Sequence, residues 1–162
     1  MARLFQILAA SALAALPGAA RAGTVIEGSV GSGFRWEPAP VERVPTNVML
    51  AGGYSFAGVL KLELGLVGDL ADVKHSKFDL DLRPMIVLKP PALPFYARAI
   101  LGVSGLVEGP AALNAGGALG VRLGALGVGA FLEAGALSRR VKLDGRNRDA
   151  WIAEARLGFY WD

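Results

Sequence analysis

The 162-residue sequence contains no cysteine and only one histidine, which removes several classes of protein from consideration. Without cysteine there is no disulfide scaffold, no thiolate catalysis and no cysteine-based metal site. A single histidine does not make a multi-histidine metal site. The net charge of +3 is too small to indicate a nucleic-acid-binding protein. What remains is a chain of single-domain length that is 53% hydrophobic and carries 22 glycines, about twice the usual share.

The first 22 residues have the organisation of a secretory signal peptide. Arg3 supplies a positive start, residues 4–16 supply an apolar stretch, and an A-x-A cleavage site ends at Ala22. The apolar stretch is shorter than the roughly 20 residues that a transmembrane helix needs. We therefore expect residues 1–22 to be cleaved on export and residues 23–162 to form one domain.

The exported part lacks any uninterrupted apolar run of about 18 residues. Its hydrophobic residues instead alternate with polar ones, most clearly where Leu60, Leu62 and Leu64 alternate with Lys61 and Glu63. This period of two is typical of β-strands. Repeated along the chain, it predicts eight strands, over residues 25–36, 47–56, 58–69, 77–88, 95–105, 114–124, 127–137 and 150–161.

The alternation has exceptions within these strands. Four apolar residues fall on the polar face, namely Met49, Ile100, Phe131 and Ile152. Pro84 lies inside the fourth predicted strand, and proline cannot donate a hydrogen bond to a β-ladder. We expect the fourth strand to bend or weaken there.

The predicted connections alternate between short and long. Short ones lie at residues 57–58, 89–94 and 125–126, whereas longer or more polar ones lie at residues 37–46, 70–76, 106–113 and 138–149. If the strands run up and down, all the longer loops lie at one end. Short turns at one end and longer loops at the other are typical of bacterial outer-membrane barrels.

Periodicity alone leaves open which face of the strands points inward. A soluble lipocalin-like barrel, carrying an apolar ligand in the periplasm, would have its leucines inside. Three features favour leucines that face lipid. The polar face is rich in glycine, as the tight interior of an eight-stranded barrel requires. Its basic residues are mostly arginine, which suits enclosed multidentate ion pairs. The apolar rows carry no charge, in keeping with the cost of charge at the bilayer midplane.

A helical membrane protein is the remaining alternative, and it depends on a repeated GxxxG spacing at Gly116, Gly120 and Gly124. The same spacing fits a strand, where all three glycines fall on the polar face. A helix would place Arg122 and Glu133 in lipid. The strand interpretation is therefore preferred.

Aromatic residues lie near the ends of the predicted strands, where they would form girdles at the two membrane interfaces. At the long-loop end they are Phe34, Trp36 and Trp151, and at the short-turn end Phe56, Phe95, Phe159, Tyr160 and Trp161. With this pattern the exported chain resembles the small outer-membrane β-barrels of Gram-negative bacteria, of the OmpA/OmpX-like type. The resemblance implies an all-β, eight-stranded antiparallel up-and-down barrel with both termini on the periplasmic side.

The last strand carries the most specific part of this resemblance. Gly158, Phe159, Tyr160 and Trp161 look like the C-terminal signal that the family presents to the outer-membrane assembly machinery, although here Asp162 follows the closing aromatic residue. The resemblance therefore implies that this machinery and the outer-membrane lipids are partners of the chain.

The polar face carries nearly balanced charge, which predicts an ion-pair network inside the barrel. Its expected members are Glu27, Arg35, Lys61, Glu63, Asp79, Asp81, Arg83, Arg98, Arg122, Glu133, Glu154 and Arg156. Such a network closes the interior or, as the alternative, lines a narrow channel for ions or small solutes. An eight-stranded barrel leaves little room for a wide pore.

Nothing in the sequence predicts an enzyme, a cofactor or a metal ion. His75 and Ser76 are adjacent in a predicted loop without a marked acidic partner, and Asp79 and Asp81 are flanked by basic residues.

The last long loop has a local charge of +3 and is the best candidate for a surface that binds lipopolysaccharide phosphates. Its basic residues are Arg139, Arg140, Lys142, Arg146 and Arg148. A structural or surface-interaction role follows, while the oligomeric state stays open.

Migration on a detergent gel tests the barrel directly. We expect protein extracted from the outer-membrane fraction to shift its band on boiling, because a closed barrel resists detergent until it is heated. A variant without residues 1–22 is the control and should not reach that fraction. A soluble periplasmic protein with no band shift would mean that the apolar faces point inward.

Overall fold

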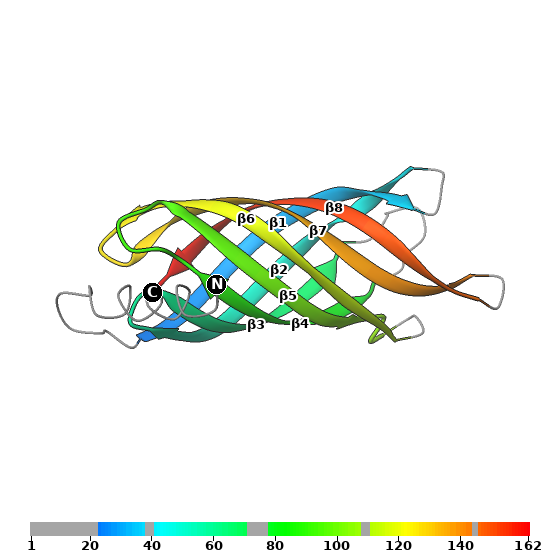
Figure 1. The fold of residues 1–162 in the computed structure, drawn as a ribbon, viewed down its shortest axis with the longest axis horizontal. Coiled ribbons are helices and arrows are strands. Elements are labelled where there is room, and N and C mark those ends of the chain that lie inside the picture. Colours follow the sequence, from blue (N-terminus) through cyan, green and yellow to red (C-terminus); the bar gives the residue numbers. More distant parts are fainter. Residues whose placement is uncertain (1–22, 38–40, 71–77, 108–110, 144–145) are drawn as a thin grey trace, which may run out of the picture.

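A computed structural model describes residues 23–37, 41–70, 78–107, 111–143 and 146–162. Eight antiparallel strands close into one barrel in chain order, with the first strand paired to both the second and the last (Figure 1). The strands are β1 (Gly23–Glu37), β2 (Glu42–Phe56), β3 (Leu60–Asp69), β4 (Leu80–Leu88), β5 (Phe95–Ser104), β6 (Ala112–Ala125), β7 (Val128–Leu143) and β8 (Arg146–Trp161). The predicted all-β, eight-stranded up-and-down barrel is confirmed.

The expected signal peptide lies outside the described residues. Within the described ranges, no helix is long and apolar enough to cross a membrane. The helical alternative is wrong, because the segment with the repeated GxxxG spacing forms β6 and pairs with β5 and β7 along its length.

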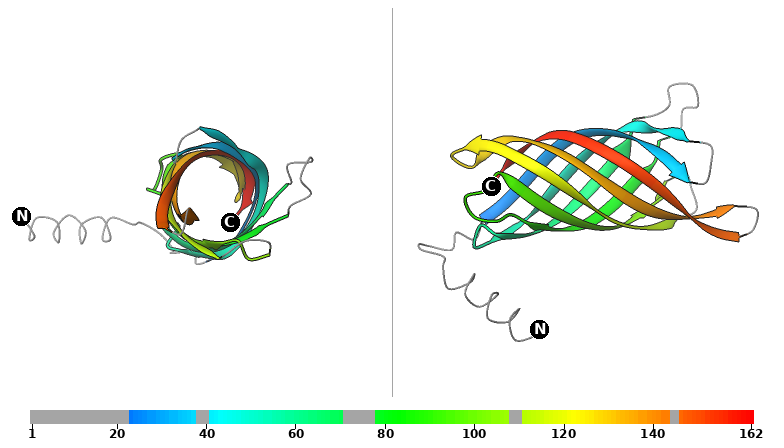
Figure 2. Two further views of the ribbon diagram at one scale, coloured as in Figure 1. Left: turned by 90° about the vertical axis from the view of Figure 1, so that its right-hand side faces the viewer. Right: turned by 45° about the horizontal axis from the view of Figure 1, so that its top comes forward.

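The leucine-rich faces point outward from the closed ring that Figure 2 shows end-on. Leu64, Leu119 and Leu132 are 52%, 71% and 60% exposed, whereas Lys61, Glu27 and Arg98 on the opposite faces are only 1–2% exposed. The lipocalin-like carrier alternative is therefore wrong, since it needs the leucines inside. The inward-facing rows fill the lumen with side chains, as expected for eight strands.

The two ends of the barrel differ. The end that holds Gly23, Asp162 and the β2–β3, β4–β5 and β6–β7 connections is the turn end, and the opposite end is the loop end. At the turn end, β6 and β7 are joined by Leu126 and Gly127, both with positive φ (56° and 82°). A two-residue turn with positive φ at both positions is type I′, which matches the twist of a hairpin. The turn thus lies one residue later than the predicted 125–126.

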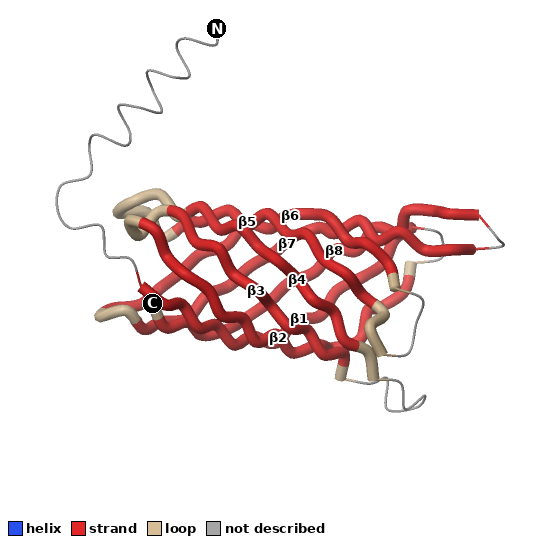
Figure 3. Tube along the Cα trace, turned by 90° about the horizontal axis from the view of Figure 1, so that it is seen from below, coloured by secondary structure: helices blue, strands red, loops and turns tan. Residues whose placement is uncertain are grey.

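Two connections at the loop end are shorter than predicted. Residues 42–46 belong to β2, so the first loop does not extend over residues 37–46. The predicted loop 138–149 is mostly strand, because β7 and β8 stay paired as far as Leu143 and Arg146. This hairpin projects beyond the other strands (Figures 1 and 3). The sequence did not reveal it, because its polar residues do not follow an apolar alternation.

Pro84 weakens one ladder without ending its strand. On the β3 side Pro84 pairs with Leu64, and β4 continues to Leu88. On the β5 side the pairing runs from Leu82–Val103 directly to Met85–Ile100 and skips residues 83 and 84. The effect expected of a proline is thus confined to the seam between β4 and β5.

Candidate functional site in the barrel lumen

The lumen contains three main groups of side chains. The turn-end cluster consists of Glu27, Lys61, Glu63, Arg98, Arg122, Glu133 and Asp162. The apolar layer consists of Met49, Ala51, Val67, Met85, Ile100, Ala118, Leu137 and Ile152. The loop-end cluster consists of Asn47, Asp81, Arg83, Arg139, Glu154 and Arg156.

Glu27 is the centre of the turn-end cluster. Its Oε2 accepts a hydrogen bond from Arg98 Nη2 at 2.6 Å, and its Oε1 accepts one from Arg122. Arg98 also reaches Glu133, with 3.3 Å between Nε and Oε2, and Glu63, with 3.4 Å between Nη2 and Oε2. The contacts bring together β1, β3, β5, β6 and β7 across the lumen. Buried charges must be paired in this way to offset their loss of hydration.

Aromatic rings enclose the arginines of this cluster. The guanidinium carbon of Arg122 lies 4.8 Å from the ring centroids of both Tyr96 and Tyr160, within the range of cation–π attraction. Tyr160 is therefore a lumen residue, and its expected place in the outer aromatic girdle is wrong. Tyr96 also covers Gly120, where an added Cβ would lie 2.3 Å from the ring, so this position needs glycine.

Asp162 is a member that the sequence analysis missed. Lys61 donates a hydrogen bond to its carboxylate, and Arg122 Nη1 lies 3.7 Å from the same oxygen. The Asp162 amide donates to Gly127 O at 2.7 Å, which ties the chain end to the β6–β7 turn. The alternation of β8 contained the signal, because continuing it past Tyr160 places residue 162 on the inward side.

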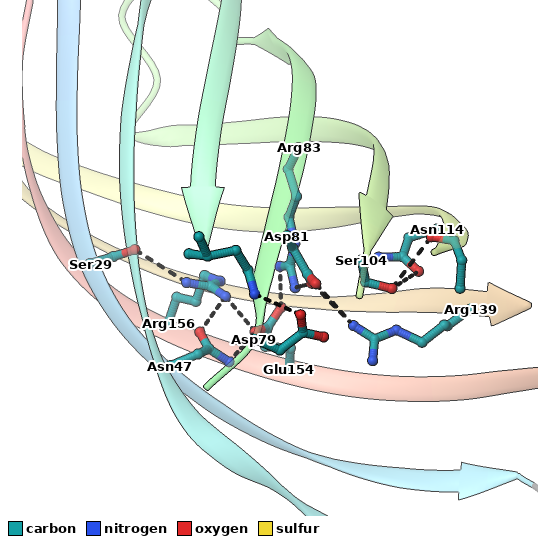
Figure 4. A network of polar contacts seen from close by, with 12 residues as sticks. Ser29, Asn47, Asp79, Asp81, Arg83, Ser104, Asn114, Arg139, Glu154 and Arg156 are labelled. Atoms are coloured by element: carbon teal, nitrogen blue, oxygen red, sulfur yellow. Dashed lines mark hydrogen bonds and ion pairs between the residues drawn. The ribbon is translucent and has the colours of Figure 1, made fainter. Parts of the chain in front are cut away.

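Arg83 and Arg156 hold Glu154 in the loop-end cluster (Figure 4). Arg83 donates from Nη1 to Glu154 Oε2 and from Nη2 to Asp81 Oδ2, both at 3.0 Å. Arg156 Nη2 donates to Glu154 Oε1 and to Asn47 Oδ1, both at 2.5 Å. The cluster therefore links β2, β4 and β8 inside the barrel.

Arg139 belongs to the lumen and not to the basic outer surface predicted for the last loop. Its Nη2 donates to both oxygens of the buried Asp81, at 3.1 and 3.3 Å (Figure 4). The next residue, Arg140, points outward and lies 3.5 Å from Asp149, with both side chains more than half exposed. Lys142, Arg146 and Arg148 lie in the β7–β8 hairpin, and their side chains are outside the described part.

Two predicted members lie at the mouth of the loop end. Arg35 donates to Glu42 there, and the Glu42 side chain is 54% exposed. Asp79 lies just before β4, where its carboxylate accepts the backbone N–H groups of Leu80 and Val107 at 2.9 and 3.3 Å. Asp79 therefore caps the strand end, whereas Arg35 borders the lumen.

The apolar layer explains three of the exceptions to the alternation. Met49, Ile100 and Ile152 are inward-facing and 1–9% exposed. They lie on their strands between or beside the charged positions, and within the described ranges no ion pair or hydrogen bond joins the two clusters. The fourth exception, Phe131, packs with Tyr96 and Tyr160 at the turn end. The two polar clusters approach each other where Glu133 pairs with Arg156 across β7 and β8, and the apolar layer lies between them only on other strands, such as β4 with Met85.

The described residues hold no group of three acidic or histidine side chains suited to a metal ion. His75 and Ser76 lie outside the described residues. The chemistry that the lumen offers is ion pairing and hydrogen bonding among guanidinium, carboxylate and amide groups.

Removing the central carboxylate tests the pairing. We expect Glu27→Gln to lower the free energy of unfolding by about 3–5 kcal/mol, because two buried guanidinium groups lose their charged partner. The matched control is Glu42→Gln at the exposed mouth pair, which should cost less than about 1 kcal/mol. Denaturant unfolding of the protein in lipid vesicles measures both. Equal small effects would contradict the view that Glu27 holds the cluster together.

Comparisons with known proteins support the fold. No family model and no curated protein sequence matches the chain. Among solved structures, Neisserial surface protein A (NspA) is similar with a TM-score of 0.61 and 11% identity, over 87% of this chain and 98% of that one. The N-terminal β-barrel domain of Pseudomonas aeruginosa OprF is similar with a TM-score of 0.51 and 11% identity, over 87% of this chain and all of that one. The chain therefore has the fold of small outer-membrane β-barrels.

Proposed function

We propose that this protein is a non-enzymatic barrel of the outer membrane with a closed lumen, whose role is structural or in surface interaction through its loop end. The observation that carries the proposal is the contrast between its two faces. The outer face is an apolar band bordered by exposed aromatic residues such as Phe159 and Trp161 at the turn end, and the stacked Trp36 and Trp151 at the loop end. The inner face is polar and densely filled. A band of this kind suits a bilayer, where charge is costly.

Closure of the lumen is the part of the proposal that separates it from a channel. Met49, Met85 and Ile100 are 1–6% exposed and belong to a layer with contributions from seven strands. An ion that passed these apolar side chains would lose part of its hydration, which is costly. We therefore assign the seal to the apolar layer as well as to the predicted ion-pair network.

Planar-bilayer conductance tests the closed lumen. We expect the wild-type protein to show no steady conductance. Arg122→Ala alone should stay closed, because it removes a guanidinium from the turn-end cluster and leaves the apolar layer intact. Steady conductance of the wild-type protein would favour the channel alternative, and opening by Arg122→Ala would show that the ion pairs alone are the plug.

The combined substitution Met49→Gly and Met85→Gly tests the apolar layer, as Arg122→Ala tests the ion pairs. Both methionine side chains contact the space beside Gly65, where an added Cβ would lie 3.0 Å from Met85 Cε and 3.3 Å from Met49 Sδ. Removing both side chains should open a water-filled path and give a measurable conductance. A closed double variant would contradict the assignment of the seal to this layer.

The projecting β7–β8 hairpin is the proposed interaction surface at the loop end. Its outward Arg140 and the basic residues Lys142, Arg146 and Arg148 suit the phosphates of lipopolysaccharide, which arginine binds in bidentate geometry. Arg139 is not part of this surface because it is paired with Asp81 in the lumen. The proposal thus assigns the two neighbouring arginines to different roles.

The last strand is proposed to carry the signal for the assembly machinery, over Gly158, Phe159, Tyr160 and Trp161. Phe159 and Trp161 point outward and are 72% and 65% exposed. Gly158 lies where an added Cβ would come within 2.4 Å of Gly28 O, so a larger residue would disturb the β8–β1 seam. These features support a recognition surface formed by the outward side chains of β8, the strand that also closes the barrel.

Neutralising the hairpin tests the surface role. We expect the combined replacement of Arg140, Lys142, Arg146 and Arg148 by Gln to weaken binding to lipopolysaccharide-containing vesicles at least about tenfold, since each exposed charge pair contributes up to about 1 kcal/mol. Vesicle co-sedimentation at two salt concentrations measures the effect. Lys89→Gln at the turn end is the single-charge control and should bind like the wild type. Undiminished binding of the hairpin variant would remove this surface from the proposal.

A further inference from the structure

A cavity of about 180 Å³ opens at the loop end, above the apolar layer. Its lining includes Arg35, Arg83 and Arg139 together with Asp81 and Glu154. This volume is many times the roughly 10–15 Å³ that one water molecule needs. The cavity is therefore large enough for a small solute.

Both carboxylates of the loop-end cluster already accept hydrogen bonds on both of their oxygens. Asp81 Oδ1 accepts from Arg139, and its Oδ2 accepts from both Arg83 and Arg139. Glu154 Oε1 accepts from Asn47 and Arg156, and its Oε2 accepts from Arg83. Each of these four oxygens has at least one donor, so a bound cation would have to displace a guanidinium group.

The donors around the cavity are in excess. The Nε atoms of Arg35, Arg83 and Arg139 are buried and have no hydrogen-bond partner within the described residues. Arg83 is itself only 5% exposed. Since a buried polar group without a partner is costly, these three N–H groups favour a ligand that supplies acceptors. A negatively charged ligand with several acceptor oxygens would also pair well with the guanidinium groups.

The apolar part of the cavity wall strengthens this preference. Leu137 and Ile152 line the cavity and belong to the apolar layer, so the cavity is not lined by polar groups alone. A charge-assisted hydrogen bond is stronger next to apolar side chains that exclude water. Glu42 and Asp69 also line the cavity and balance its charge, so selection among solutes comes from the unpaired donors and not from net charge.

We propose that the loop-end cavity is a binding site for a small oxyanion of the phosphate type, held by the Nε–H groups of Arg35, Arg83 and Arg139. The site is a blind vestibule, and the anion binds there without passing through the barrel. The phosphate group comes either from a free anion or from a lipid headgroup that reaches the mouth. This site is separate from the outward hairpin surface, because Arg139 and Arg140 lie on opposite faces of β7.

Titration with inorganic phosphate tests the site on the full mature protein in detergent free of phospholipid. We expect saturable binding by isothermal titration calorimetry at constant ionic strength. Arg139→Gln should weaken it at least about tenfold, as expected for loss of a hydrogen bond from a charged donor. Lys89→Gln at the turn end removes the same charge and should bind like the wild type. Absence of saturable binding by the wild-type protein would overturn the proposal.

A second variant separates the cavity from general attraction to a basic surface. Ala150 is 1% exposed and lines the cavity, so Ala150→Leu fills it without changing charge. We expect this variant to lose phosphate binding while keeping the band shift on boiling that shows a folded barrel. Binding that persists in folded Ala150→Leu would overturn the proposal.

Competition then identifies the source of the phosphate group. If micelles that contain a phosphorylated glycolipid displace inorganic phosphate in an Arg139-dependent manner, the natural ligand group is a headgroup. If they do not displace it, the site takes a free anion. Both outcomes keep the oxyanion site, and they differ only in the ligand that delivers it.

Discussion

The pairing of buried guanidinium and carboxylate groups across the lumen is the interaction on which the rest of the structure depends. Eight closed strands leave a narrow interior that side chains largely fill. The inward rows of this chain carry arginine, lysine, glutamate and aspartate, and most of these charged groups are buried away from bulk water. Glu27 shows the consequence, since one carboxylate receives Arg98 from β5 and Arg122 from β6. The same contacts join strands that are not neighbours in the sheet, and they stabilise the closed barrel across its lumen.

The lumen combines charged and apolar side chains. Met49, Met85 and Ile100 belong to an apolar layer with contributions from seven strands. In the turn-end cluster, aromatic rings surround Arg122, and the side-chain carboxylate of Asp162 lies close to it. At the loop end, the Nε atoms of Arg35, Arg83 and Arg139 have no hydrogen-bond partner among the described residues, and all three arginines line a cavity.

The outer surface follows a different rule. On the outer face of the barrel most residues are apolar, and leucine, alanine and glycine all occur there. At the loop end, β7 and β8 stay paired as far as Leu143 and Arg146. Ladder hydrogen bonds join the two strands of this hairpin. Strand length at the loop end is therefore set by pairing and not by hydrophobic alternation.

The period of two along the chain by itself determined the class of fold, because a strand turns each successive side chain to the opposite face. The spacing placed Leu64 and Lys61 on opposite faces, and the glycine-rich and arginine-rich composition of the polar face indicated that Lys61 points inward. The partners inside the lumen could not be read in this way. Glu27 meets Arg98 across 71 positions and Arg122 across 95, and these distances depend on the tilt and stagger with which eight strands close. Only the tertiary structure decided that Tyr160 and Asp162 meet Arg122, that Arg139 pairs with Asp81, and that apolar side chains from seven strands gather beside the charged clusters, since each requires the register of strands on opposite walls of the barrel.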